Sequence, residues 1–157
     1  MSAIRLLIVA AAVGFFVGVV FIFVQPLFGM SPLTQRHAEA YMNLGSMSAG
    51  TAFTVAWAVH LFISVCYGLA VGIALLLSRN AIPFIIQLVV FAWVTTVIAP
   101  PANALLVRLI GSKSLPSPEQ LPPLNFQLDA KLLLHILFFA AIAAALWVTC
   151  RDRQVSD

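Results

Sequence analysis

The sequence contains very little charge. Only 8% of its 157 residues are charged, whereas an ordinary soluble domain has roughly 25%. Hydrophobic residues make up 62% of the chain. Because a chain of this size cannot bury so much apolar surface in a core surrounded by water, the lipid bilayer must act as part of its solvent. The eight Lys and Arg residues form no cluster, which excludes the basic patch that a nucleic-acid partner requires.

Cysteine and the common catalytic motifs are also scarce. The two cysteines, Cys66 and Cys150, lie at or inside apolar stretches, where a disulfide is not expected. The sequence has no CxxC, HExxH, Gly-rich phosphate loop or Ser/His/Asp set, so it predicts no metal ligand and no catalytic residue. No carboxylate falls in the middle of an apolar stretch, so the usual relay of a proton-coupled transporter is missing. We therefore predict a protein that is not an enzyme.

What the sequence does have is long apolar runs. The stretch from Thr51 to Leu77 contains no Asp, Glu, Lys or Arg, and at about 1.5 Å per residue it can cross a hydrocarbon core of about 30 Å. Three further runs are also long and apolar, with at most two charged residues in each. The sequence predicts an all-α integral membrane protein with a single transmembrane domain, residues 1–157, whose lipid-spanning helices cover about 4–24, 51–77, 82–98 and 128–148.

The two longer loops predict short helices that lie at the membrane interface. In the first, Ser31 and Pro32 have the pattern of a helix start, and Gly45 that of a helix stop. In the second, Ala99-Pro100-Pro101 is expected to break the third span, and residues 102–111 to form a separate interfacial helix. Asp129 is expected to serve the first turn of the last span.

Four glycines form pairs at small-xxx-small spacing. Gly14 and Gly18 lie in the first span, and Gly68 and Gly72 lie in the second. Such pairs let two helix backbones approach closely in a membrane. The pairs therefore predict a helix-packing contact between these two spans.

Two histidines, His60 and His135, are the ionisable residues expected at membrane depth. Counted from the expected span ends, both fall in the outer half of the bilayer. The favoured interpretation is structural: each neutral ring bonds a backbone carbonyl, a Ser or Thr hydroxyl or the other histidine, and Ser64 and Thr54 are candidates near His60. The alternatives are axial ligation of a haem b, with both histidines as cofactor ligands, or a proton or quinone role. His37, in the first loop, is interpreted as part of a solvated cap, with a ligand or pH-sensing role as the alternative.

The orientation is predicted with both termini inside. The positive charges divide evenly between the two sides, so the positive-inside rule alone does not decide. The inner set lies in short flanks, whereas the outer set lies in longer loops that also hold acidic residues. On this assignment the inner set is Arg5, Arg79, Arg151 and Arg153, and the outer set is Arg36, Arg108, Lys113 and Lys131.

The residues around both histidines resemble the YagU family of small bacterial inner-membrane proteins. The similar pieces are His60-Leu-Phe-Ile-Ser64 and His135-Ile-Leu-Phe-Phe139, together with the Pro-Pro pair between the third and fourth spans and the Arg-Asp-Arg tail. The chain departs from the family in having a shorter loop between its first two spans. The resemblance implies a four-span protein of the bacterial inner membrane with a loose link to acid tolerance, and it carries no catalytic residue across.

The sequence thus leaves three functional hypotheses. The leading one is a non-catalytic accessory subunit that packs against other integral membrane subunits, with electron-transport complexes as the expected hosts. The second is an electron carrier that holds one haem b between His60 and His135. The third is a stand-alone inner-membrane stress or acid-tolerance protein, as the resemblance implies.

Overall fold

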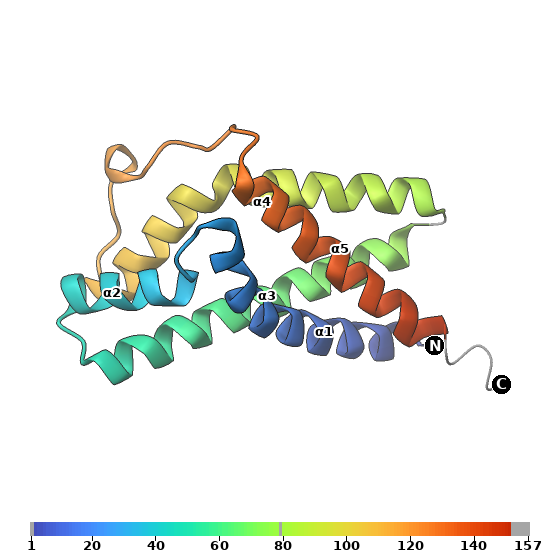
Figure 1. Ribbon diagram of the computed structural model, residues 1–157, viewed down its shortest axis with the longest axis horizontal. Coiled ribbons are helices and arrows are strands. Elements are labelled where there is room, and N and C mark those ends of the chain that lie inside the picture. Colours follow the sequence, from blue (N-terminus) through green and yellow to red (C-terminus); the bar gives the residue numbers. More distant parts are fainter. Residues whose placement is uncertain (1, 79, 152–157) are drawn as a thin grey trace.

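The computed structural model describes residues 2–78 and 80–151, and within them every regular element is a helix. Four helices are long and apolar enough to cross a membrane, so the protein has an all-α membrane fold. Both ends of the described chain lie at the same end of the molecule (Figure 1). The elements in order are α1 (Ala3–Val24), η1 (Gln25–Phe28), α2 (Leu33–Gly45), α3 (Ala49–Leu77), α4 (Ala81–Gly111), η2 (Pro118–Gln120) and α5 (Ala130–Arg151).

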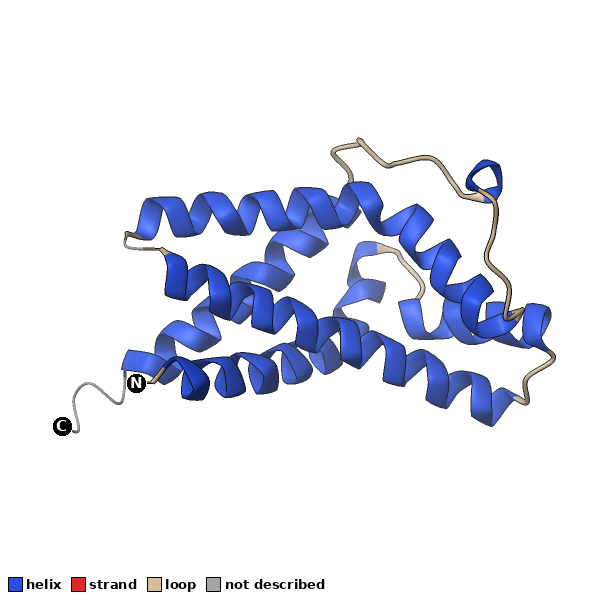
Figure 2. Cartoon of the chain, turned by 180° about the vertical axis from the view of Figure 1, so that it is seen from behind, coloured by secondary structure: helices blue, strands red, loops and turns tan. Residues whose placement is uncertain are grey.

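The molecule has two parts, a bundle and a cap. In the bundle, α1 and α5 run beside the C-terminal half of α3 and the N-terminal half of α4 (Figures 1 and 2). In the cap, α2 packs against α3 and α4 where these two helices extend beyond the bundle. The cap exists because α3 and α4 are longer than α1 and α5 by roughly two turns or more.

Glycines bring α1 and α3 into backbone contact. A Cβ atom added to Gly14 would lie 2.9 Å from the Cα of Gly68, and one added to Gly68 would lie 2.9 Å from the Cα of Gly14. A Cβ atom added to Gly18 would meet the side chain of Ser64, and one added to Gly72 would meet that of Ala10. No larger residue fits at these positions without separating the two helices.

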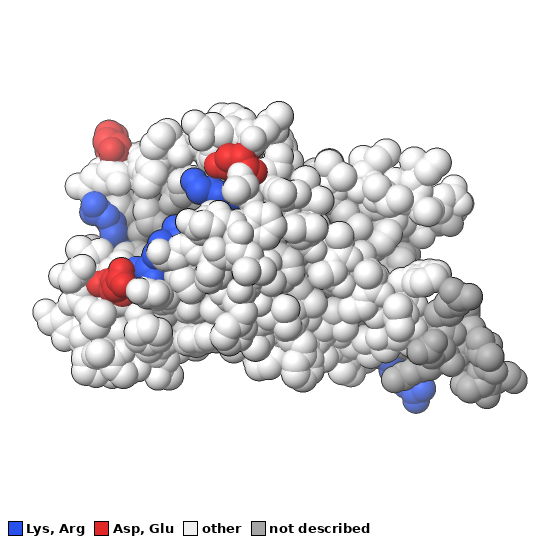
Figure 3. Space-filling view, viewed as in Figure 1, with Lys and Arg blue, Asp and Glu red and all other residues white. Residues whose placement is uncertain are grey.

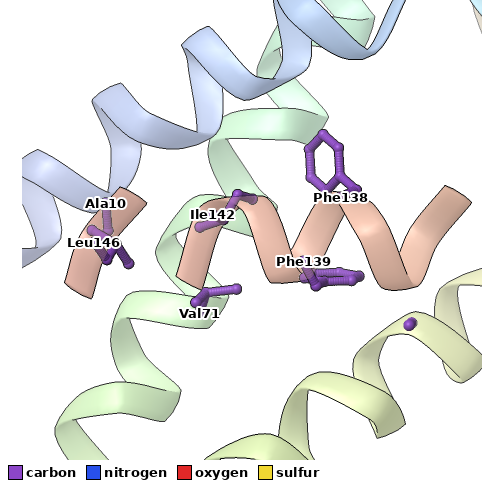
Figure 4. Packing of buried hydrophobic residues seen from close by; sticks show 7 residues of the cluster. Ala10, Val71, Phe138, Phe139, Ile142 and Leu146 are labelled. Atoms are coloured by element: carbon purple, nitrogen blue, oxygen red, sulfur yellow. The ribbon is translucent and has the colours of Figure 1, made fainter. Parts of the chain in front are cut away.

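A compact apolar core joins the remaining bundle helices. Its buried members come from α1, α3, α4 and α5, and α5 contributes most of them (Figure 4). The ring of Phe138 lies 5.0 Å from that of Phe21 and 5.9 Å from that of Tyr67, measured between centroids. Such edge-on aromatic pairs add packing energy to the area that they bury. The buried members are Ala10, Val71, Ala92, Phe138, Phe139, Ile142 and Leu146.

Helix α4 corrects one prediction. The expected break at Ala99-Pro100-Pro101 does not occur, and residues 102–111 continue the same helix instead of forming a separate one. Pro101 has no N–H to give to the carbonyl of Val97, and the backbone N–H of Asn125 donates to that carbonyl instead, at 3.0 Å. Figure 1 shows that α4 changes direction near these prolines, so that its last part leans toward α2.

The predicted helix of the first loop is present as α2, but its two ends differ from the expectation. Ser31 does not cap it, because the side-chain oxygen of Gln25 accepts from the backbone N–H of Leu33 at 2.7 Å. Gly45 is the last helical residue, and Ser46 takes the left-handed conformation, with φ of 50°. Gly45 is needed for space, since a Cβ atom there would come against the backbone of Gly111 in α4.

Charged side chains are unevenly distributed over the molecule. In Figure 3 the charged side chains gather at the end that holds α2, and the bundle is white apart from a small basic area at its far end. If the antiparallel pairing of Gly14 with Gly68 is extended along the helices, Val24 lies level with about Ala58. The apolar bundle thus contains parts of all four helices that could span a membrane, and the charged cap lies at one of its ends.

The glycine contact predicts opposite effects for two substitutions in α3. Gly68→Ala should lower the free energy of unfolding by about 1–3 kcal/mol, because the new methyl group overlaps α1. Gly50→Ala is the matched control: no atom lies within 4 Å of a Cβ added there. It should leave stability unchanged or raise it by up to about 1 kcal/mol. Thermal unfolding in detergent measures both, and equal melting temperatures would contradict the close approach of α1 and α3.

Candidate functional site

A cavity of about 440 Å³ lies where the cap meets the bundle. All five α-helices contribute to its wall, and all three histidines of the protein line it. The structure thus brings His60 and His135 to one cavity, as the comparison of their depths suggested, and adds His37 to them. The cavity is the strongest candidate site, because it is concave and combines an apolar wall with a few polar groups.

His60 joins α3 to α1. Its Nε2 atom lies 2.9 Å from the backbone carbonyl of Gly18, to which it donates a hydrogen bond between α3 and α1. Ser64 and Thr54, the partners suggested from sequence, bond backbone carbonyls of α3 instead. Helix α3 begins at Ala49, close to the span start expected at Thr51, and it extends past the end of α1. Two residues beyond Ala58, the backbone of His60 lies about 3 Å inside the level at which α1 ends.

His135 joins α5 to α4. Its Nδ1 atom lies 2.9 Å from the hydroxyl of Thr96, and that hydroxyl donates to the carbonyl of Ala92 at 2.7 Å. Because the single hydroxyl proton is engaged there, Nδ1 of His135 is the donor, and Nε2 is left as an acceptor in the neutral ring. The contacts of His60 and His135 with a carbonyl and a hydroxyl are of the structural kind that the sequence favoured.

His37 lines the cavity from α2 and is only 6% exposed. Neither of its ring nitrogens has a hydrogen-bond partner among the described residues, and the same holds for the hydroxyl of Tyr41, whose ring lies 6.0 Å from that of His37. Burial, with a smaller effect from Arg36 and His60, lowers the pKa of His37 from 6.5 to about 4. His37 is therefore neutral at physiological pH and belongs to a buried site, not to a solvated surface.

The end of the cavity next to the cap is polar and basic. Arg36 comes from α2 and Lys131 from the first turn of α5. Asp129 caps α5 as predicted, since its carboxylate accepts from the backbone N–H groups of Lys131 and Leu132. The same carboxylate lies 3.8 Å from the ammonium group of Lys131. Gln25 and Asn103 add neutral amides to this end.

The end inside the bundle is apolar. Phe21, Tyr67 and Phe138 line it, with their rings packed edge-on against one another. Ile63 and Leu134 extend this wall toward the histidines. The cavity therefore changes from basic to aromatic along the direction from the cap into the bundle.

Sequence reasoning missed most of this site. Arg36 and Lys131 were assigned to the same side of the membrane but were not connected with the histidines. Asn103 was placed in a separate interfacial helix, whereas the continuous α4 brings it to the cavity wall. The available signal was a set of polar residues that immediately flank span ends on one side. The described part of the chain brings together no cluster of His, Cys, Asp or Glu that could hold a metal ion.

Comparison with known proteins gives no assignment: no family model, no curated protein and no solved structure matches this chain.

The burial of His37 predicts a pH effect on stability. The folded protein keeps this ring neutral down to about pH 4, whereas the unfolded chain takes up a proton below about pH 6.5, so stability should fall as the pH drops through this range. His37→Gln should reduce the fall, measured as the change in melting temperature between about pH 7 and about pH 4.5. Asn43→Gln, at an exposed position of α2, is the control and should keep the wild-type slope. The same change in melting temperature with pH in all three proteins would contradict a buried, neutral His37.

Proposed function

We propose that this protein is a non-catalytic membrane protein that binds an amphiphile, a molecule with a polar head and an apolar tail, in the cavity between cap and bundle. The observation that supports this most is the change in polarity along the cavity. Arg36, Lys131 and Asn103 line one end, and the aromatic group of Phe21, Tyr67 and Phe138 lines the other. An amphiphile matches both ends at once, whereas a fully polar or a fully apolar ligand leaves one of them unmatched.

The position of the cavity supports the same proposal. His60 lies about two residues inside the level at which α1 ends, so the polar end of the cavity faces the headgroup region. A lipid-like molecule in the bilayer already has its head at this level. Its tail would enter the aromatic end without leaving an apolar environment, so binding requires little additional desolvation.

The size of the cavity also fits. Ligand pockets have volumes of about 300–1,000 Å³, and the volume of about 440 Å³ falls in this range. It is sufficient for a head and part of a single chain. We infer that the rest of a longer tail extends into the surrounding lipid.

This role is compatible with the cellular setting proposed from sequence. In a bacterial inner membrane with both termini inside, the cavity opens toward the outer leaflet. Ligand binding suits an accessory subunit of a larger complex, which can hold a lipid or a lipid-like carrier at the interface with its partner. It also suits a stand-alone protein of the kind that the YagU resemblance implies.

Filling the cavity tests the proposal. Ala102 lines the cavity from α4, and Ala102→Phe should weaken binding of radiolabelled decanoate and decanol by about tenfold or more, because the ring occupies the ligand's volume. Ala144→Phe places the same ring at an exposed position of α5 outside the cavity and should have no effect. Binding is measured on protein in phosphatidylcholine nanodiscs, with empty nanodiscs subtracted. Equal binding by the two variants, or no binding by the wild type, would contradict the proposal.

A haem b is the second candidate, because His60 and His135 line the same cavity. The hydrogen bonds of these histidines make it the weaker one. Ligation through Nε2 of His60 would break the contact with Gly18, and the pair would no longer join α3 to α1. The amphiphile proposal needs no such rearrangement.

The visible spectrum of the purified protein separates the two candidates. We expect no Soret band in the wild type and normal folding of His60→Gln, because Gln still offers a donor to the carbonyl of Gly18. A Soret band that disappears in both His60→Gln and His135→Gln would replace the amphiphile proposal with haem binding, since neither variant supplies an imidazole nitrogen.

A further inference from the structure

We propose that the cavity selects amphiphiles whose head is an anion, a carboxylate or a phosphate, held between Arg36 and Lys131. This inference rests on the proposed function and specifies the chemistry of its ligand. It starts from the composition of the cavity wall. Among the residues that the structure describes, two cationic side chains line the cavity, and no Asp or Glu does.

Arg36 is available to a ligand. Its guanidinium group makes no hydrogen bond and no ion pair with any residue that the structure describes, although Glu39 lies one turn further along the same helix. Glu39 is engaged by Gln35, whose side-chain amide donates to it at 3.0 Å. A guanidinium group without a partner offers paired N–H donors, which match the two oxygens of a carboxylate or a phosphate.

Lys131 is only weakly held. Its ammonium group lies 3.8 Å from Asp129, beyond ordinary hydrogen-bond distance, and its side chain is 52% exposed. The other oxygen of Asp129 is occupied by the first turn of α5. Because an exposed pair at this distance contributes little, Lys131 can turn to an anionic head at small cost.

The neutral groups at the same end also favour an anion. The side-chain oxygen of Gln25 accepts from Leu33, so its amide N–H groups are the atoms left for a ligand. The side-chain amide of Asn103 has no hydrogen-bond partner in the described part of the chain and can turn its N–H groups toward the cavity. Together with Arg36 and Lys131 they form a set rich in donors, which suits an oxyanion better than a hydroxyl or an ammonium head.

Three probes with the same chain length test the selection: decanoate, decyl phosphate and decanol, each radiolabelled and titrated onto the protein in phosphatidylcholine nanodiscs. At about pH 8 both acidic heads are ionised. We expect at least one anionic probe to bind about tenfold more tightly than decanol, the difference that one charge-assisted hydrogen bond makes. A preference for decanoate assigns the site to fatty acids, and a preference for decyl phosphate assigns it to phosphate-bearing lipids.

Variants connect the selection to the two cations. Arg36→Gln and Lys131→Gln should each weaken binding of the preferred anion by about tenfold and leave decanol binding unchanged. Lys113→Gln removes one positive charge outside the cavity wall and should change neither the binding of the preferred anion nor that of decanol. Equal binding of decanol and both anions, or an equal loss in all three variants, would overturn the selection and leave the proposed function standing. Failure of all three probes to bind the wild type would overturn both the selection of anions and the proposed function.

Discussion

The contact between α1 and α3 is the constraint on which the rest of the structure depends. Without side chains at Gly14 and Gly68, the two backbones meet and fix the relative height of the helices. At that height the side chain of His60 reaches the backbone carbonyl of Gly18, and their hydrogen bond ties the two helices together. Because lipid tails are as apolar as the helices, the hydrophobic effect contributes little to helix association in a membrane. Close packing and polar contacts of this kind must hold the helices together.

The cavity follows from how the helices continue beyond this contact. Helices α3 and α4 pass the end of α1 and leave a space that α2 covers. The prolines of α4 deflect its last part toward α2, and Gly111 meets Gly45 there without intervening side chains. A gap then remains where the cap meets the bundle, and side chains from five helices line it. The same geometry places basic groups at the cap end of the cavity and aromatic rings at its bundle end.

The sequence predicted what depends on local pattern. The apolar runs predicted the spanning helices, Asp129 was recognised as the cap of α5, and the glycine spacing placed the contact residues on the helices that meet. It could not predict that α4 continues past Pro101, because the compensating donor, Asn125, is distant in the chain. The cavity could not be predicted either, because His37 and Lys131 line the same cavity only when the helices assemble. The residues that flank His37 and Lys131 in the sequence do not indicate a shared cavity.

The depth of two points on α3 in the bilayer tests this arrangement most directly. Cys66 is exposed on the bundle part of α3, and Phe53 is exposed on the part that extends into the cap, about 20 Å away along the helix. One protein carries a spin label at Cys66 together with Cys150→Ser, and the other carries a label at Phe53→Cys together with Cys66→Ser and Cys150→Ser, so that each has a single label. The labels report depth by their relative access to oxygen and to a water-soluble nickel complex. The arrangement predicts that Cys66 lies in the hydrocarbon and residue 53 at or beyond the headgroups. Equal depth at the two positions would contradict it, because the cavity would then lie within the lipid core.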